Sequence, residues 1–590
     1  MHTADWTVLI TYLVGTVLLG IFLGKLIRNP SDMFAAGGKS PWWTSGLSAF
    51  MTMFSANTFV VWGGLAYQYG VVAILVNLCY GLAALLAGFT VAGKWKRLGI
   101  RTPAEYVEKR FGVAALHFYT WAMMIFRIVG AAGALYAIAT LIVAVTGGSD
   151  TAKVVTGLPP KLVTAILVFG AIVVLYTMIG GLWAVLMTDV LQFIILNLAV
   201  IFVVVLILNG MGGFGGFLEQ APEGFLALTA PPKYTWLFLA GWVAVHYFMI
   251  GAEFAFVQRY ICVPTPKDAR KGAYLFGFLY LFSPFLWLLP PLLWRVQSPI
   301  PEGASPEMIV GIKETAYIQS CKSVLPVGMV GLMLAAMFSA TASLISSQLN
   351  VFSGVLTNDI YRPLAKAVTE KRLLFMGRVF TVVLGVVIAG IALLIPSLGG
   401  AEKVIVAITE LMVVPMLAPV LWGLLNRKID SSALWLTAGI CIPLGIALHF
   451  GFAKGGFLDQ RMPEDGSGGF LLWLSFNFKT LVGVILPLVI MLLVQASAKS
   501  ESPRWKDVQA LHERPEVDES ATASSHLPAL LVGWSMVVVG AGMSMLIPVN
   551  SEDRLMLGVF AMIMALLGAV IVGVGRRQRK QAREGEAELR

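Results

Sequence analysis

Long apolar runs, one after another, are the feature of this sequence that most constrains its fold. Runs with almost no charge recur along the whole chain, and about 20 apolar residues are what a helix needs to cross roughly 30 Å of hydrocarbon. Only 13% of the 590 residues are charged, against about 25% in a typical soluble domain. Strands of a membrane barrel are about half as long and alternate in polarity. The sequence therefore predicts an all-α polytopic membrane protein.

The apolar runs divide into about fifteen predicted transmembrane helices. Basic residues are denser on alternate loops, as in KWKRLGIRTPAEYVEKR and RRQRKQAREGEAELR. Because Lys and Arg mark cytoplasmic loops, this bias predicts an N-terminus outside and a cytoplasmic C-terminus. The first run lacks a preceding basic region and a cleavage site, so it is expected to remain as a span. The predicted spans are 6–27, 42–67, 70–92, 114–146, 161–179, 183–208, 234–261, 273–295, 326–356, 376–397, 401–425, 431–452, 477–497, 530–547 and 554–576.

Charge and composition also exclude several classes of function. A basic inner surface facing anionic lipid accounts for the net charge of +10, so no nucleic-acid partner is expected. The four cysteines have neither metal-ligand nor disulfide spacing, and no nucleophile–base pair or phosphate loop indicates an enzyme. A channel is disfavoured because no selectivity motif repeats. A sensor is disfavoured because no signalling domain is recognised after residue 576.

Two predicted spans carry a polar interruption near their centre. The second contains the sequence SANT at 55–58, and the seventh contains His246 and Glu253. Transporters often place binding sites where a helix is broken at the bilayer midplane. The two spans are five apart, so they enter the membrane from opposite sides, as expected for an inverted five-plus-five repeat. Close helix packing by small residues is the alternative explanation.

Two ionisable residues inside the apolar runs are candidates for function, since such groups are costly in a bilayer. Arg127 is the only Lys or Arg that lies more than two residues from the end of a predicted span. Its guanidinium can hold a carboxylate through two hydrogen bonds, which favours an anionic substrate such as an acidic sugar. Alternatively, it pairs permanently with Glu253 or Glu410. Asp189 lies between two apolar runs, either on a cation pathway or paired with a basic inner loop.

The stretch YTMIGGLWAVLMTDVLQ, residues 176–192, resembles the signature of the sodium:solute symporter family. That signature reads roughly Y-x-x-x-G-G-L-x-A-V-x-x-T-D-x-x-Q, and nine positions match in order. Further agreement comes from GGKSPWW, RTPAEYVEKRFG, QRYICVPTPKDARKGA and TNDIYRP, so that the resemblance extends over residues 1 to about 450. It implies a LeuT-type core of five plus five helices at spans two to eleven, with extra spans outside the core, that works by alternating access.

The resemblance also implies that sodium is the co-transported ion. Backbone carbonyls and one hydroxyl are expected to hold it, with an acidic side chain on its inner exit path. At the position that usually supplies a second hydroxyl, this chain has Leu344. The predicted site therefore has one side-chain oxygen fewer than the family pattern, and proton coupling stays open as an alternative. The residues implied to hold the cation are Met51, Phe54, Ala340 and Ser343, and Asp189 is predicted on its inner exit path.

The predicted function is a secondary active transporter that imports a small polar solute, with a sugar or sugar acid favoured. An amino acid or carboxylate carried by the same fold, coupled to protons or uncoupled, is the alternative. A bacterial inner membrane is the expected location. The predicted substrate-binding residues are Ser55, Asn57, Thr58, Arg127, His246 and Glu253, and the predicted gate residues are Trp62, Tyr67, Tyr136 and Tyr247.

The predicted organisation follows the spans. An N-terminal span and inner loop occupy 1–41, and two five-helix repeats occupy 42–208 and 234–425. The remaining predicted segments are additional spans over 426–497, a cytoplasmic linker over 498–527, and two last spans with a basic tail over 528–590.

Overall fold

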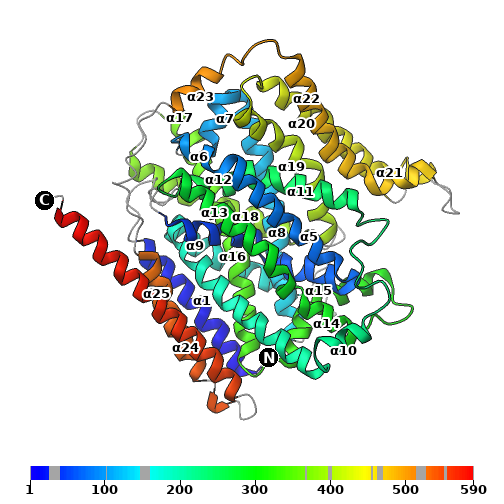
Figure 1. Cartoon of the computed structure of the whole chain (residues 1–590), viewed down its shortest axis with the longest axis vertical. Helices are drawn as coiled ribbons and strands as arrows, with labels where there is room; N and C mark the ends of the chain where they lie inside the picture. The colour runs from blue at the N-terminus through cyan, green and yellow to red at the C-terminus, as the bar shows by residue number, and fades with distance from the viewer. Residues whose placement is uncertain are drawn as a thin grey trace.

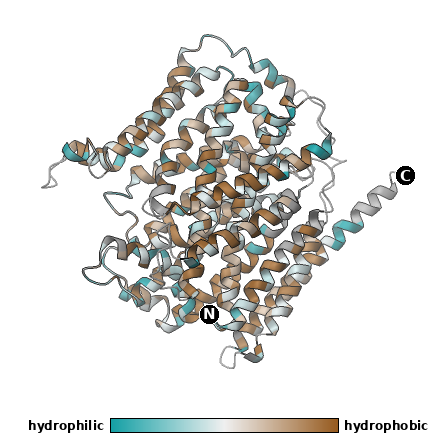
Figure 2. Cartoon of the chain, turned by 180° about the vertical axis from the view of Figure 1, so that it is seen from behind, coloured by the Kyte–Doolittle hydropathy of each residue, from teal (hydrophilic) through white to brown (hydrophobic). Residues whose placement is uncertain are grey.

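The structure is a computed structural model of the full chain. It describes residues 2–24, 40–100, 102–146, 160–365, 369–395, 401–453, 456–461, 469–512, 527–545, 547–549 and 554–588. Throughout these ranges the chain is helical, apart from turns and one isolated bridge between Ala230 and Tyr234. Most of the long helices are apolar along much of their length, as Figure 2 shows. The predicted all-helical membrane architecture is therefore confirmed.

The helices of the first half are α1 (Thr3–Gly24), α3 (Trp42–Met53), η2 (Thr58–Trp62), α4 (Gly63–Tyr69), α5 (Val72–Ala87), η3 (Gly88–Ala92), α6 (Gly93–Arg97), α7 (Pro103–Phe111), α8 (Val113–Thr146), α9 (Pro160–Gly210), α10 (Gly213–Gln220), α11 (Trp236–Ala252), α12 (Phe254–Ile261), α13 (Pro266–Trp287) and α14 (Leu289–Gln297). Those of the second half are α15 (Pro306–Val324), α16 (Met329–Val355), η4 (Leu356–Tyr361), α17 (Arg362–Leu364), α18 (Glu370–Ala392), α19 (Ala401–Leu425), α20 (Ser431–Gly451), α21 (Gly469–Thr480), η7 (Leu481–Ile485), α22 (Leu486–Ser497), α23 (Trp505–His512), α24 (Leu527–Ser544) and α25 (Arg554–Glu588).

Each predicted span coincides with helical structure over its described residues, while 25–27, 396–397 and 546 lie outside them. Among the described residues, 10 helices are long and apolar enough to cross a membrane, or up to 12 if each of two bent pairs counts as one span. Two shorter apolar helices, Pro160–Leu175 and Ala529–Ser544, correspond to two further predicted spans. The chain is therefore a multi-pass membrane protein, while the count of fifteen and the orientation of the termini stay predictions.

The predicted break between the fifth and sixth spans is wrong as a break in helical structure. One helix, α9, runs for 51 residues through this segment. Glycine costs a helix only about 1 kcal/mol relative to alanine, so the Gly180–Gly181 pair weakens the helix here without ending it.

The predicted inner linker also contains ordered structure. Its first part forms α23, and the Trp505 ring lies 5.2 Å from the guanidinium carbon of Arg110 on α7. The Arg110 side chain is buried and donates hydrogen bonds to the backbone carbonyls of Gly423 and Asn426. Residues 513–526 of this linker lie outside the described residues.

The helix α16 lies at the centre of the fold. It packs against α1, α3, α8, α9 and α18. Nearly all residues of its most apolar stretch are buried inside the protein. Its small residues, in the sequence FSATASLISSQ, allow this close approach of several helices. By contrast, α24 and α25 pack along each other at one edge of the molecule, next to α1 and α9 in Figure 1.

Two helical pairs next to α16 are sharply broken. Trp42–Met53 and Thr58–Tyr69 meet at an angle of 59°, and Trp236–Ala252 and Phe254–Ile261 meet at 51°. The backbone at each break is extended, with φ −93° and ψ 128° at Phe54 and φ −72° and ψ 140° at Glu253. These are the two interruptions that the sequence predicts.

Candidate functional site

A cavity lies where the two broken helices face each other. Its volume is about 90 Å³, several times the roughly 10–15 Å³ that one water molecule needs. The wall comes from α3, η2, α5, α8, α11, α16 and α19. Its polar and aromatic lining residues are Thr52, Ser55, Asn57, Trp62, Tyr80, Phe126, Arg127, Trp242, His246, Gln348 and Thr409.

Local hydrogen bonds hold the first break open. The Ser55 amide donates to the Thr58 hydroxyl at 3.3 Å, and the Asn57 amide donates to the Ser55 hydroxyl at 3.2 Å. The Ala56 amide donates to the Thr341 hydroxyl of α16 at 2.8 Å. Backbone groups freed by the break are thus satisfied by short polar side chains, as helix ends require. This need explains why small polar residues interrupt an apolar span here.

Arg127 of α8 reaches the cavity and pairs with the second break. Its Nη2 lies 3.0 Å from Oε2 of Glu253, with 11% of the Arg127 side chain exposed and none of Glu253. Of the two partners that the sequence left open, the structure pairs Arg127 with Glu253. Glu410 lies instead 3.8 Å from Nζ of Lys479. Because Arg127 both lines the cavity and forms an ion pair, its two proposed roles are compatible.

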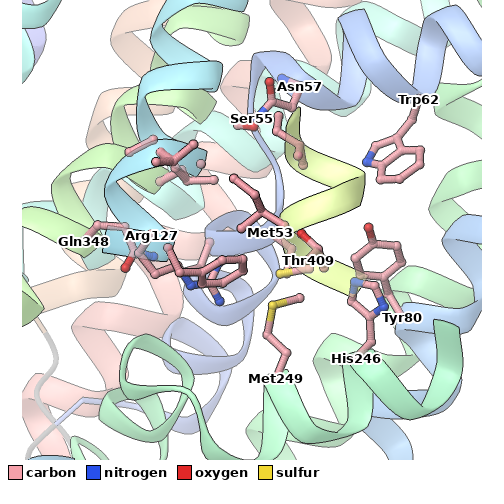
Figure 3. A pocket seen from close by; sticks show the side chains of 18 of the residues that line it. Met53, Ser55, Asn57, Trp62, Tyr80, Arg127, His246, Met249, Gln348 and Thr409 are labelled. Atoms are coloured by element: carbon pink, nitrogen blue, oxygen red, sulfur yellow. Dashed lines mark hydrogen bonds between the residues drawn. The ribbon is translucent and has the colours of Figure 1, made fainter. Parts of the chain in front are cut away.

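Aromatic rings cover the opposite side of the cavity from Arg127, as Figure 3 shows. His246 packs against Tyr80 with ring centroids 3.8 Å apart and ring planes tilted by 47°, and its Nδ1 lies 2.8 Å from the Trp242 carbonyl oxygen. A donated hydrogen bond from Nδ1 leaves Nε2 as the acceptor of a neutral imidazole. Trp62 packs edge-on against Trp242 at 6.0 Å. The cavity therefore has a cationic side faced by aromatic rings, and the Phe126 ring centroid also lies 5.2 Å from the guanidinium carbon of Arg127.

The structure brings only some of the predicted residues to this cavity. Ser55, Asn57, Arg127 and His246 line it, whereas Thr58 and Glu253 support it from behind. Of the predicted gate residues, Trp62 is part of the lining. The hydroxyl of Tyr67 donates to the Ser298 carbonyl, that of Tyr247 is bonded to Thr90, and Tyr136 is buried elsewhere in α8.

Sequence reasoning missed several lining residues, of which Thr52, Tyr80, Gln348 and Thr409 are polar. A signal for Gln348 was present, because it lies four residues after Leu344 and so on the same face of α16. Both residues line the cavity. Thr409 and Tyr80 carry no comparable signal, since nothing in their neighbouring sequence distinguishes them from packing residues.

The residues predicted for the cation lie around a second buried polar cluster. Ser48 of α3 donates to Oδ2 of Asp189 at 2.5 Å, and the Ser343 side chain lies close to the same carboxyl. Neither the Ser343 hydroxyl nor Oδ1 of Asp189 has a hydrogen-bond partner among the described residues. Met51, Phe54 and Ala340 are buried on the two adjoining helices. Unpaired buried oxygens of this kind are suited to a hard cation.

Arg259 completes this cluster, which corrects the expectation that Arg127 is alone in the membrane. The Arg259 side chain is buried, with Nη2 donating to Ser347 at 2.6 Å and Nε donating to Ser48 at 3.3 Å. It lies at the end of α12, where the sequence read QRY as the start of an inner loop. Bending at Glu253 redirects α12, and the cluster joins α3 and α12 to α9 and α16.

An all-helical membrane protein with two broken helices at one central cavity has the architecture of a secondary transporter. The profile of the Sodium:solute symporter family matches residues 33–438. The chain therefore belongs to the sodium:solute symporter family, and it is a transporter rather than an enzyme.

Individual relatives agree with this assignment. The chain is 27% identical over 463 residues to the sodium/sialic acid symporter NanT of Aliivibrio fischeri, which covers 73% of this chain and 85% of that protein. It is also 27% identical over 463 residues to the sodium/glucose cotransporter of Vibrio parahaemolyticus, with 74% and 82% covered. A solved Na⁺-coupled sialic acid symporter in a substrate-bound, outward-open state superposes with TM-score 0.65 at 22% identity, covering 83% of this chain and 98% of that one. The chain shares the fold of that symporter.

Proposed function

We propose that this transporter imports a sugar acid together with sodium by alternating access. The observation that carries the substrate class is Arg127, whose guanidinium reaches a central polar cavity lined by the first helix break and by α11, the helix that leads into the second break. A cationic side faced by aromatic rings suits a solute with a carboxylate and a ring or carbon chain that packs on an aromatic face. The relatives include a sialic acid symporter and a glucose cotransporter, and both names agree with a sugar or a sugar acid as the solute.

Sodium is proposed to bind where α3, α9 and α16 meet. The main-chain carbonyls of Met51, Phe54 and Ala340 and the side chains of Ser343 and Asp189 supply oxygens there. Support comes from the Ser343 hydroxyl and Oδ1 of Asp189, which lie close to each other and have no other partner among the described residues, because buried oxygens of this kind need a donor or a cation. Leu344 supplies no side-chain oxygen, so the affinity for sodium is expected to be modest.

Uptake by the purified protein in liposomes tests the proposal. Labelled N-acetylneuraminate, gluconate and glucose would be offered under an inward sodium gradient, a proton gradient or neither. Saturable uptake of an acid that follows the sodium gradient is expected. Uptake of glucose alone would refute the acid, and uptake that follows only the proton gradient would move the coupling to protons.

The role of Arg127 needs a variant that does not leave Glu253 charged and alone. The double variant Arg127→Gln with Glu253→Gln replaces the ion pair by two neutral amides of similar shape. We expect it to fold and to lose at least tenfold in affinity for the acid while retaining sodium-dependent stabilisation. Normal uptake of the acid by the folded double variant would show that the pair is only structural.

We also propose an orientation of the chain in the membrane and the extent of the two repeats. The N-terminus is placed outside and the C-terminus in the cytoplasm of a bacterial inner membrane, with repeats at 42–208 and 234–425. The basic loops on one side of the membrane support this orientation. Labelling single cysteines introduced into the loops, in a variant that lacks the four native cysteines, would report which loops are outside.

A further inference from the structure

Gln348 is an amide side chain whose hydrogen-bonding capacity is entirely unused within the described part of the protein. It is 1% exposed, and neither its oxygen nor its nitrogen has a hydrogen-bond partner there. Burying an amide without partners costs about 1–3 kcal/mol. A side chain with both ends unpaired is therefore expected to have a partner that binds from outside the chain.

Gln348 differs from other buried, unpaired amide side chains by its location in the fold. Among the described residues, Gln192, Gln348 and Asn350 each leave both side-chain ends unpaired. Of these three, Gln348 alone lines the central cavity. Asn350 lies on the same helix two residues away and provides a matched control, because it has the same unpaired chemistry but no access to the cavity.

The amide shares its side of the cavity with Arg127. Figure 3 places both residues away from Trp62, Tyr80 and His246, and α8 packs directly on α16. Arg127 has five N–H donors, and its ion pair with Glu253 engages Nη2. The contact with Glu253 does not have the geometry of a hydrogen bond, and neither Nε nor Nη2 donates a hydrogen bond to a described residue. This side of the cavity thus offers a cationic donor next to a group that both donates and accepts.

That combination selects a particular chemical pattern. A carboxylate only accepts hydrogen bonds, so Arg127 and the Gln348 NH₂ group can both bind it. The Gln348 carbonyl oxygen then still needs a donor close to the carboxylate, and a hydroxyl on the neighbouring carbon provides one. Simple carboxylates and neutral sugars each satisfy only part of this set, and a site built for a hydroxyl discriminates strongly against an analogue that lacks it.

From this geometry we infer that Gln348 is a specificity-determining residue that recognises, together with Arg127, a 2-hydroxy carboxylate group of the solute. The inference rests on the proposed transport of a sugar acid and narrows it to acids of the aldonic and ulosonic kind. In uronic acids the carbon next to the carboxylate carries the ring oxygen and no hydroxyl, so they bind more weakly.

The test compares Gln348→Met and Asn350→Leu with the unaltered protein in sodium. Affinity would be measured from thermal stabilisation of the purified protein by N-acetylneuraminate and gluconate, each beside its 2-deoxy analogue and beside glucuronate. The unaltered protein is expected to prefer the 2-hydroxy acid about tenfold over its 2-deoxy analogue, as one satisfied hydrogen bond implies. Gln348→Met is expected to lose that preference, and Asn350→Leu is expected to keep it.

The melting temperature measured without any solute shows whether a substitution affects folding rather than solute binding. Because methionine removes an unpaired amide, Gln348→Met is expected to melt at the same or a higher temperature than the unaltered protein when no acid is present. If the methionine variant cannot be purified, Gln348→Glu serves instead, since its carboxylate repels the substrate acid and should abolish the stabilisation.

The outcomes distinguish the two proposals. If the unaltered protein binds neither acid, transport of a sugar acid is refuted and the inference about Gln348 is refuted with it. If the unaltered protein binds an acid and Gln348→Met keeps the same affinity and the same preference for the hydroxyl, only the inference is refuted. A loss of preference in Asn350→Leu equal to that in Gln348→Met would also refute it.

Discussion

Removing either partner of the ion pair between Arg127 and Glu253 is predicted to cost several kilocalories per mole of folding free energy, because the pair is buried at a helix break. At 3.0 Å and an effective dielectric constant of about 20, the Coulomb attraction is about 5 kcal/mol. Removing one partner leaves the other charge buried and alone, which costs about 3–5 kcal/mol. Glu253→Gln and Arg127→Gln are therefore each expected to destabilise the protein by about 3 kcal/mol or more.

The double variant decides whether that loss is electrostatic. With both charges gone, no buried charge is left uncompensated, so the double variant is expected to be more stable than either single variant. The assay is a double-mutant cycle on unfolding in mixed SDS and maltoside micelles, with Glu501→Gln as a control for removing an exposed carboxylate whose partner, Arg427, lies 3.4 Å away. A coupling energy below about 1 kcal/mol would refute the reasoning, because exposed pairs already reach that value.

Three further predictions concern the cation cluster and α23. Asp189→Asn should weaken sodium-dependent stabilisation and leave a folded protein, and unchanged sodium dependence would remove Asp189 from the cation pathway. Leu344→Ser should raise the affinity for sodium by restoring a hydroxyl beside Ser343, with Leu344→Ala as the control for lost volume; equal sodium affinity in both variants would contradict this. Trp505→Ala should release α23 and cost about 1 kcal/mol, since it removes the ring over Arg110, and limited proteolysis would then cut near residue 505 faster than in the unaltered protein.

Local chemistry was enough to predict the helices and where two of them break. Apolar length decides whether a segment crosses a bilayer, and that property belongs to each segment alone. The run of Ser55, Asn57 and Thr58 could be recognised as a break because these side chains satisfy backbone groups within a few residues. The same locality explains one failure. Gly180 and Gly181 look like a break, but glycine also permits helical backbone angles, and α9 continues through them.

The ion-pair partner of Arg127 could not be predicted from the local sequence. Arg127 had Glu253 and Glu410 as candidate partners, lying 126 and 283 residues away in the chain, and only the packing of α8 beside the bend after α11 selects Glu253. Arg259 was assigned to the start of the inside segment QRYICVPTPKDARK, at the end of the seventh predicted span, yet the bend at Glu253 carries it into the protein interior.

The sequence by itself therefore determined the class of protein, the membrane-crossing helices and the two interrupted spans, since all of these follow from composition and order over about 20 residues. Only the tertiary structure decided which polar groups share the central cavity. Ser55, His246 and Gln348 come from three helices, and Tyr67 and Tyr247 were equally plausible in sequence but point elsewhere. The direction of a side chain from a membrane helix depends on the rotation and neighbours of that helix, and those are set by contacts between residues far apart in the chain.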